Sequence, residues 1–286
     1  MKDYFGYENK VCVVTGASSG MGKATAEMLV DLGAQVYALD IVESNSEGLT
    51  KFIQVSLGEK DSIDQAFAQI PDEIDSFFGI AGVAGVRQDY NTTVTINYIA
   101  NKYMTETYLL GRMKPGGAIS FITSTAGWNW ENQDYRTELQ PIIDRNSWEG
   151  AVATLEAMNQ NSKPGGLGYI FSKRALNYYI ASIVQDFAAK KVRVNGVLPA
   201  ATQSGLTDEF AILSGGKENL MKSVGLVGRI AESREMAEPI VFLNSNMASF
   251  ISGVLLNVDY GQYTQTILGE VPNVVDFKLL DAQIEV

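Results

Sequence analysis

Residues 11–22 read VCVVTGASSGMG, an apolar run that leads directly into a glycine-rich turn. The β-branched residues at 11–14 predict a strand, and residues 23–32 place apolar side chains at the spacing of one helical face. Gly33 is expected to end that helix, and residues 35–39 predict a second strand. The opening of the chain therefore predicts one βαβ unit of about 30 residues.

The turn between the first strand and the helix has the composition of a phosphate-binding turn. Glycines at 16 and 20 let the backbone approach a pyrophosphate closely, and the following helix directs its free N–H groups toward it. A Walker loop is excluded, because Lys23 is followed by Ala24 and the required first glycine falls on Ala17. A G-x-G-x-x-G pattern fails too, because three residues separate Gly16 from Gly20. The alternative is an ordinary tight turn.

The rest of the chain continues the alternation of strands and helices. This alternation predicts an α/β fold with a doubly wound parallel sheet of the Rossmann type, in a single domain at 1–286. Two segments fall outside the rhythm, an insertion at 128–166 and a C-terminal tail at 262–286. The further strands are expected at residues 52–55, 76–80, 118–122, 192–198 and 254–258, and the further helices at 62–68, 94–113, 167–189 and 235–243.

The composition excludes several classes of function. The chain has no histidine and one cysteine, Cys12, which excludes a Ser-His-Asp triad, a disulfide within the chain and a thiolate cluster, so we expect no metal site. The net charge of −11 argues against nucleic acid as a partner. No apolar run is long enough to span a membrane, and the polar N-terminus does not resemble a signal peptide, so the cytoplasm is the expected location.

Asp40 lies at the end of the second predicted strand, 20 residues after Gly20. A carboxylate at this position can accept hydrogen bonds from the adenosine ribose of NAD, and it would repel the additional phosphate of NADP. No arginine or lysine stands at Ser18, Ser19 or Ile41 to attract that phosphate. The sequence therefore predicts NAD as the cofactor. The alternative is that Asp40 only caps the end of its strand.

Tyr169 and Lys173 begin a long predicted helix, and their i, i+4 spacing places them on one helical face. Such a pair is common by chance, but here it follows other motifs in a characteristic order. In this order and spacing the chain resembles the short-chain dehydrogenase/reductase family over about residues 9–261. The motifs that carry the resemblance are the turn Thr15–Gly22, Asp40, Asn97, Ser124, the pair Tyr169 and Lys173, Asn195–Pro199 and Val258–Gly261.

The resemblance implies hydride transfer between a nicotinamide cofactor and an alcohol or ketone, with a tetrad of Asn97, Ser124, Tyr169 and Lys173. Tyr169 would exchange the proton of the alcohol, and Ser124 would hydrogen-bond the substrate oxygen. A free tyrosine has a pKa of about 10. A lysine ammonium about 4 Å away would supply about the 4 kcal/mol needed to lower the pKa of the tyrosine toward 7. Asn97 would hold a water that passes protons to Lys173.

The resemblance also assigns a set of cofactor contacts. Ser204 would lie against the nicotinamide amide, and Gln54 stands where the family often has an adenine-binding Asp. Gly79, Ala200 and Tyr260 replace frequent residues of the family, which suggests a divergent branch. The expected cofactor-binding residues are Gly16, Ser18, Ser19, Gly20, Met21, Asp40, Ile41, Gln54, Val55, Ala81, Gly82, Tyr169, Lys173, Thr202 and Ser204.

Two features of length narrow the branch. The link between Asp40 and Phe52 is too short for the usual helix, and Ser124 and Tyr169 stand 45 positions apart. The chain thus resembles the 3-hydroxysteroid dehydrogenase/carbonyl reductase branch, which also holds aromatic-alcohol dehydrogenases. The insertion carries three tryptophans, which could form flat apolar walls for a substrate or could pack at a subunit interface or in the core. They are Trp128, Trp130 and Trp148.

We therefore expect a small apolar alcohol or ketone as substrate, first a 3-hydroxysteroid or bile acid, and alternatively an aromatic or other small alcohol. A homodimer or homotetramer is expected through the helices around Asn97 and after Tyr169, where residues 178–181 are apolar on several faces. The rival functions are a non-catalytic NAD-binding regulator and an epimerase or dehydratase of the extended family. The last would need a G-x-x-G-x-x-G turn and a large C-terminal domain, which the sequence lacks.

Overall fold

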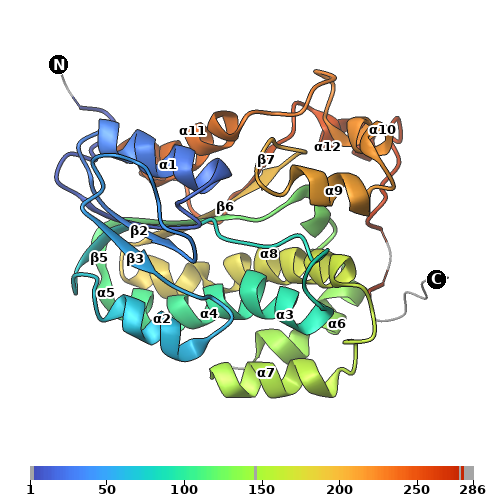
Figure 1. Cartoon of the computed structure of the whole chain (residues 1–286), viewed down its shortest axis with the longest axis horizontal. Helices are drawn as coiled ribbons and strands as arrows, with labels where there is room; N and C mark the ends of the chain where they lie inside the picture. Colours follow the sequence, from blue (N-terminus) through green and yellow to red (C-terminus); the bar gives the residue numbers. More distant parts are fainter. Residues whose placement is uncertain (1–2, 145–146, 277, 280–286) are drawn as a thin grey trace.

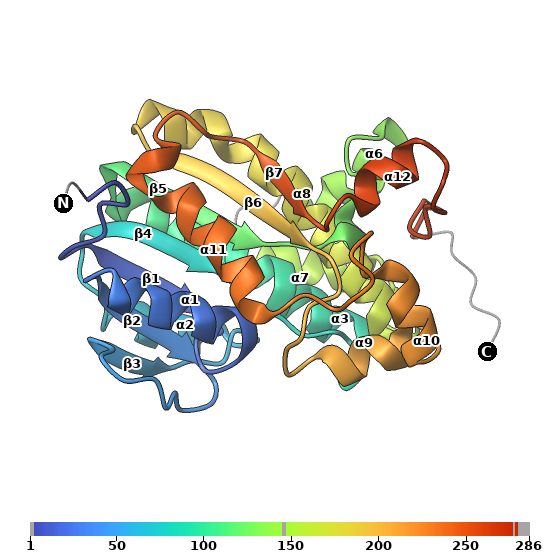
Figure 2. The same ribbon diagram turned by 90° about the horizontal axis from the view of Figure 1, so that it is seen from above.

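The computed structural model describes residues 3–144, 147–276 and 278–279. Within them, seven parallel strands form one sheet in the order β3-β2-β1-β4-β5-β6-β7 (Figure 1, Figure 2). This order confirms the predicted doubly wound sheet. The strands are β1 (Val11–Thr15), β2 (Gln35–Asp40), β3 (Lys51–Gln54), β4 (Ile74–Gly79), β5 (Met113–Ile122), β6 (Arg193–Pro199) and β7 (Leu255–Val258).

Helices cover both faces of the sheet, each over its own apolar cluster. The helices α1 (Gly20–Asp31) and α11 (Ser233–Asn244) pack together on one face, above the sheet in Figure 1. The other face carries α2 (Lys60–Phe67), a helical run at 90–112 and α8 (Gly165–Ala189). Most side chains of α8 are buried, as expected for a helix that is apolar nearly all round.

The helical run at 90–112 differs from the prediction of a helix at 94–113. It begins four residues earlier, because the carboxylate of Asp89 accepts a hydrogen bond from the Thr92 N–H and caps the first turn. It is irregular, since two π-helical turns interrupt it. The parts are α3 (Tyr90–Val94), a π turn (Thr95–Ile99), α4 (Ala100–Met104), a second π turn (Thr105–Leu109) and α5 (Leu110–Arg112).

The two segments outside the predicted rhythm fold into short helices. The insertion forms α6 (Gln133–Ile143) and α7 (Trp148–Ala157), and the tail begins with α12 (Gln262–Ile267). A further loop between β6 and α11 carries α9 (Thr207–Leu213) and α10 (Lys217–Leu220). As predicted, residues 41–50 contain no helix between β2 and β3.

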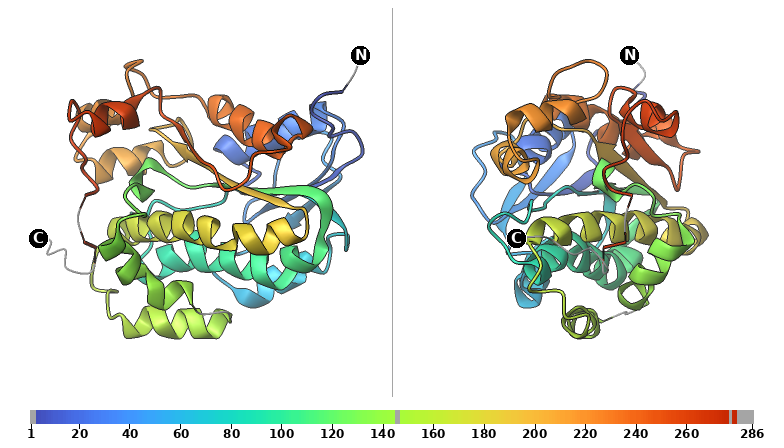
Figure 3. Two further views of the ribbon diagram at one scale, coloured as in Figure 1. Left: turned by 180° about the vertical axis from the view of Figure 1, so that it is seen from behind. Right: turned by 90° about the vertical axis from the view of Figure 1, so that its right-hand side faces the viewer.

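The insertion packs on the outer surface of the 90–112 run and α8, away from the sheet (Figure 3). The Trp148 ring meets Tyr103 edge-on with centroids 5.6 Å apart, and Trp130 stacks on Tyr178 at 6.2 Å. The Tyr178 hydroxyl donates to the side chain of Gln140 at 2.7 Å. We predicted that these two helices pair with a second subunit. The insertion covers part of the surface through which that pairing would form, and the pairing itself stays a prediction.

Candidate active site

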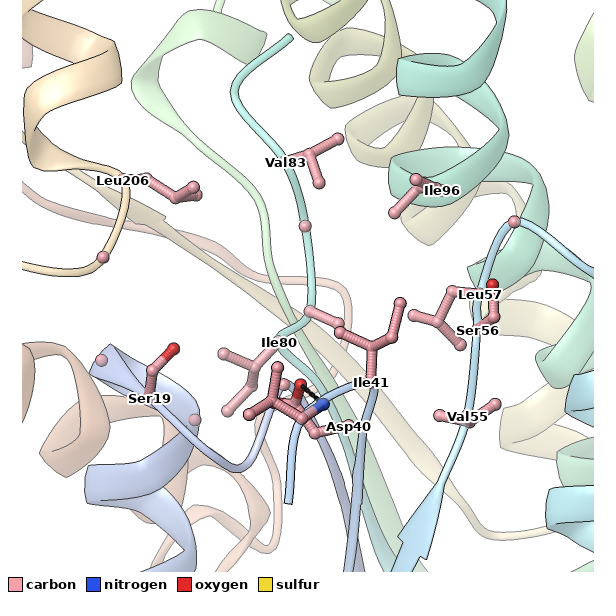
Figure 4. Close-up of a pocket in the computed structure, with 18 of the residues that line it drawn as sticks. Ser19, Asp40, Ile41, Val55, Ser56, Leu57, Ile80, Val83, Ile96 and Leu206 are labelled. Carbon is pink, nitrogen blue, oxygen red and sulfur yellow. Dashed lines mark hydrogen bonds between the residues drawn. The ribbon is translucent and has the colours of Figure 1, made fainter. Parts of the chain in front are cut away.

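A cavity of about 840 Å³ opens at the carboxyl ends of the strands, at the point where the strand order reverses between β1 and β4. Ligands of open α/β sheets bind at this topological switch point. Asp40 at the end of β2, Ile41 after it, Val55 after β3 and Ile80 after β4 surround it, with Ser19 at the start of α1 (Figure 4).

The glycine-rich turn fits a bound pyrophosphate because its backbone leaves no room for side chains. Gly16 has a positive φ of 70°, and a Cβ there would lie 2.8 Å from the Cα of Ala81. A Cβ on Gly22 would lie 2.0 Å from the Gly16 carbonyl oxygen. The helix α1 therefore begins directly at the cavity, where its free N–H groups and positive end favour an anion.

Asp40 combines both interpretations that the sequence allowed. It lines the cavity, and its carboxylate accepts hydrogen bonds from the backbone N–H groups of Ser18 at 2.9 Å and Val42 at 3.1 Å. Gln54 points elsewhere, since its side chain is exposed and donates to the Ile41 carbonyl at 3.1 Å. The large cavity thus has an acidic side chain at its end beside β2 and β3 and no lining contribution from Gln54.

Most of the predicted cofactor residues come together, though two do not. Ser18 and Gln54 line neither of the two cavities found in the described chain. Tyr169, Lys173 and Thr202 line the second cavity, which is described below. Four residues that were not predicted also line the large cavity. They follow shortly after predicted strands, and that position could have indicated them: Val42, Ser56, Leu57 and Val83. The predicted residues that line the large cavity are Gly16, Ser19, Gly20, Met21, Asp40, Ile41, Val55, Ala81, Gly82 and Ser204.

A second cavity of about 240 Å³ adjoins the first and contains Ser124, Tyr169 and Lys173. The two cavities share lining residues, among them Met21, Gly82 and Ser204. Ser124 follows β5, and the tyrosine and lysine lie in the first turns of α8. The structure therefore brings Ser124 together with a tyrosine and a lysine that stand 45 and 49 positions later in the sequence.

Lys173 is buried and Tyr169 is half-buried, and this removal from water changes the affinity of both groups for protons. Burial raises the pKa of Tyr169 to about 12, and a hydrogen bond with Ser124 opposes this rise. Burial lowers the pKa of Lys173 to about 8. The lysine Nζ lies 5.6 Å from the centre of the Tyr169 ring and donates to the Ile122 carbonyl at 3.0 Å. We expect the lysine ammonium and the oxidised nicotinamide together to lower the pKa of Tyr169 toward about 7. In the chain without cofactor, burial has the larger and opposite effect on this pKa.

Asn97 lies in the first π-helical turn, fully buried. Its Oδ1 accepts from the Val83 N–H at 2.8 Å, and its Nδ2 donates to the Val83 carbonyl at 2.9 Å and to the Ser172 hydroxyl at 3.2 Å. A Cβ on Gly82 would lie 3.0 Å from Asn97 Oδ1 and 3.7 Å from Lys173 Nζ. The asparagine therefore braces the loop after β4 against α8, beside the lysine.

The three tryptophans have different positions. Trp128 lines the second cavity, donates from Nε1 to Asn257 at 2.7 Å and packs on the Tyr263 ring at 4.9 Å. Trp130 and Trp148 pack on the outer helices instead and line neither cavity. Trp128 therefore lies where an aromatic wall of the second cavity is expected, whereas Trp130 and Trp148 do not.

The described residues contain no group of three or more acidic, histidine or cysteine side chains that could hold a metal ion. In the same residues, no helix has both the length and the apolar character needed to cross a membrane.

Comparisons with known proteins agree with this geometry. The family model for short chain dehydrogenases matches residues 10–134, and one described as enoyl-(acyl carrier protein) reductase matches residues 135–263. The coniferyl-alcohol dehydrogenase of Pseudomonas sp. (strain HR199 / DSM 7063) is 32% identical over 256 residues, covering 88% of this chain and 96% of that protein. The 3-alpha-hydroxysteroid dehydrogenase/carbonyl reductase of Comamonas testosteroni is 24% identical over 254 residues, covering 88% and 95%.

A solved structure is similar over nearly the same range. The 3-alpha-hydroxysteroid dehydrogenase from Pseudomonas sp. B-0831, complexed with NADH, superimposes with a TM-score of 0.74 at 26% identity, covering 91% of this chain and 98% of that one. The fold, the cavity at the switch point and the adjoining serine, tyrosine and lysine define a nicotinamide-dependent oxidoreductase that acts on alcohols or ketones. The chain belongs to the short-chain dehydrogenase/reductase family.

Proposed function

We propose that this protein is an NAD-dependent dehydrogenase that oxidises an apolar, ring-bearing alcohol reversibly, with Tyr169 as the general acid and base. One observation carries the proposal: Ser124, Tyr169 and Lys173 line a cavity that adjoins a dinucleotide-sized cavity and shares residues with it. The nicotinamide supplies the acceptor or donor of hydride when it is bound. The close-packed turn at Gly16 and the carboxylate of Asp40 would hold that cofactor.

The residues of the chain divide the proton chemistry between them. Tyr169 takes the proton of the alcohol during oxidation and returns it during reduction. Ser124 hydrogen-bonds the tyrosine and would also hold the substrate oxygen, so that charge developing on this oxygen has a donor nearby. Lys173 places a buried positive charge beside the ring, which favours the tyrosinate over the neutral phenol. Asn97 holds the loop after β4 in position. In this proposal it also holds a water that passes protons to Lys173.

The preference for NAD over NADP is supported by the charge at the adenosine end of the large cavity. The Asp40 carboxylate lies there, held by two backbone N–H groups, and it would repel a second phosphate. Arg87 also lines this cavity, but it pairs with Glu209 at 3.0 Å. The charge therefore favours the cofactor without the additional phosphate.

The second cavity supports a neutral, apolar substrate of modest size. Among the described residues that line it, Lys173 alone carries a charge, and Trp128, Phe210 and Leu220 supply apolar surface. Its volume of about 240 Å³ lies below the range of roughly 300–1,000 Å³ typical of sites for drug-sized ligands. We therefore favour an alcohol with one or two rings, in agreement with the similarity to the coniferyl-alcohol dehydrogenase.

A hydroxysteroid is the second candidate, supported by the similarity to two 3-alpha-hydroxysteroid dehydrogenases. Exposed apolar side chains of the α9 and tail segments, Leu213 and Val274 among them, could cover the part of a steroid that extends beyond the cavity. A bile acid fits less well, because its carboxylate would find no positive partner on the described walls other than Lys173.

The test is turnover of a panel with NAD, containing coniferyl alcohol, a 3α-hydroxysteroid and cyclohexanol. Tyr169→Phe should retain NAD binding and lose at least about 10²-fold in kcat, because general acid-base catalysis contributes about that much. Tyr178→Phe is the control, since this tyrosine lies on the same helix and donates to Gln140 outside the cavities. Wild-type turnover by the Tyr169→Phe enzyme would refute the assignment.

We also propose a homo-oligomer, through a surface other than the one covered by the insertion. The edge strand β7 is only partly buried, and Phe250 and Met247 just before it are 103% and 53% exposed. An unpaired edge with exposed apolar side chains is a common interaction surface. Light scattering should show a dimer or tetramer for the wild type and a smaller species for Phe250→Asp. Monomer for both would refute the proposal.

A further inference from the structure

The C-terminal tail contributes part of the wall of the second cavity. Gln262 on α12 and the later residues Pro272, Val274 and Val275 line the cavity together with Tyr169. These residues come after the last strand of the sheet, so the sheet itself does not fix their position. Something else must hold this part of the tail over the cavity.

Arg174, the residue next to Lys173, binds the tail directly. Its side chain is fully buried, and its Nη2 donates to the Val275 carbonyl at 2.6 Å. The guanidinium lies over the Tyr135 ring of α6, 4.3 Å from the ring centre. Burying a charged guanidinium costs free energy, and apolar side chains can often fill the same space at no loss of stability. What the arginine supplies here is a hydrogen bond of fixed direction to the tail.

The insertion holds the next residue of the tail. The Asp276 carboxylate accepts from the Tyr135 hydroxyl at 2.7 Å and from the Asn129 side chain at 3.2 Å. Asn129 in turn accepts from the Asn273 side chain at 3.2 Å. The hydrogen bonds of Tyr135 and Asn129 thus fix both ends of the short tail segment that faces the cavity.

Trp128 of the insertion also contacts the tail. Its ring packs against Val275 and Tyr263, so the tail contacts the insertion through apolar surface as well as through hydrogen bonds. The aromatic side chain that we expected to contact substrate is therefore also a support for the tail.

We propose that residues 272–276 are the specificity-determining wall of the substrate cavity, and that Arg174 and Tyr135 are positioning residues that hold this wall over the catalytic tyrosine. The inference rests on the proposed alcohol dehydrogenase function and extends it. It assigns the choice between ring-bearing and small alcohols to the tail, while Ser124, Tyr169 and Lys173 perform the same chemistry on both.

The first test uses two conservative variants that differ in what the tyrosine hydroxyl binds. Tyr135→Phe keeps the ring on Arg174 and removes the hydrogen bond to Asp276. We expect KM for coniferyl alcohol to rise about 10-fold, with kcat, KM for NAD and the turnover of cyclohexanol nearly unchanged. Tyr178→Phe is the matched control, because its hydroxyl binds Gln140 of α6 at the same 2.7 Å and does not reach the tail. It should leave all these constants unchanged.

The second test alters the wall without disturbing a buried contact. Val274 lines the cavity and is 77% exposed, so Val274→Trp should fold normally. It should narrow the cavity and reduce kcat/KM for coniferyl alcohol at least about 5-fold, while cyclohexanol is unaffected. Ile267→Trp is the control, since Ile267 is 66% exposed on the same tail and does not line the cavity.

The outcomes separate this inference from the proposed function. The inference is refuted if Tyr135→Phe and Tyr178→Phe change KM for coniferyl alcohol equally. It is also refuted if Tyr135→Phe lowers kcat/KM equally for coniferyl alcohol and cyclohexanol. An unchanged preference in Val274→Trp would overturn it as well. If the wild type oxidises neither alcohol, the proposed function fails. In that case the role of residues 272–276 is tested by calorimetric measurement of the dissociation constant of coniferyl alcohol. We expect the variants to change this constant by the same factors as KM. Absence of binding to the wild type would count against the wall also.

Discussion

Replacing Lys173 by methionine should shift the pH dependence of alcohol oxidation. In the folded protein the Lys173 ammonium lies 5.6 Å from the centre of the Tyr169 ring. At an effective dielectric constant of about 20, a unit charge at this distance stabilises the tyrosinate by about 3 kcal/mol. This corresponds to about 2 pKa units, or about a 100-fold change in the fraction of ionised tyrosine. The variant should therefore lose about 100-fold in the oxidation rate at neutral pH.

The loss should depend on pH in a definite direction. Burial lowers the pKa of Lys173 to about 8, so the wild-type side chain carries its charge below this pH and loses it above. The difference between wild type and Lys173→Met should be largest below about pH 8 and should shrink as the pH rises toward about 10. The assay is the initial rate of NADH formation with saturating NAD across this range, with the dissociation constant of NAD measured in parallel.

The same experiment can refute the reasoning. A constant ratio of the two rates across the pH range would show that the lysine acts through a fixed contact rather than through its charge. Lys190→Met serves as the control, because Lys190 caps the far end of the same helix and is exposed. Its profile should coincide with that of the wild type at every pH.

Three further predictions follow from the site. Asp40→Asn should raise the ratio of kcat/KM for NADP to that for NAD about 10-fold, since one repelling charge is removed; an unchanged ratio contradicts our interpretation of Asp40. Trp128→Ala should raise KM for a ring-bearing alcohol, whereas Trp148→Ala should reduce only the free energy of urea unfolding, by about 3 kcal/mol; steady-state kinetics and urea titrations separate the two. Without cofactor, Lys173→Met should be more stable than the wild type at pH 7 by about 2 kcal/mol, because burial lowers the pKa of Lys173 to about 8, below its unfolded value. This advantage should decline from about pH 8 to about pH 10.5 as the unfolded chain loses its proton, and equal urea midpoints at pH 7 would contradict it.

The sheet and the pair of Tyr169 and Lys173 were predictable because their signals are local in the sequence. A strand, a glycine turn and a helix follow one another within residues 11–31, and each reveals itself by periodicity or composition. Tyr169 and Lys173 share one turn of a helix, so their proximity follows from helical geometry. Their place beside Ser124 followed from the resemblance to the family, and the structure confirms this proximity.

The contacts of the tail and the insertion were not predictable, because no local pattern encodes them. Val275 binds Arg174 across 101 positions of sequence, and Asp276 binds Tyr135 across 141. The tryptophans show the same limit. Their positions in the sequence place all three after Ser124 in the insertion, but only the packing shows that Trp148 faces Tyr103. Burial likewise depends on the whole fold, so its upward effect on the pKa of Tyr169 cannot be read from the sequence.

The position of the insertion has a consequence for how the protein reaches its native state. Part of the outer surface of α8 is covered by α6, which precedes it in the chain, so the burial of that part requires no encounter with a second molecule. A helix that was buried only between subunits would need assembly, which is a concentration-dependent step. Here this part of α8 can acquire its native surroundings in a unimolecular reaction. The rate at which Tyr178 and Trp130 regain their packing after dilution from denaturant should therefore be independent of protein concentration.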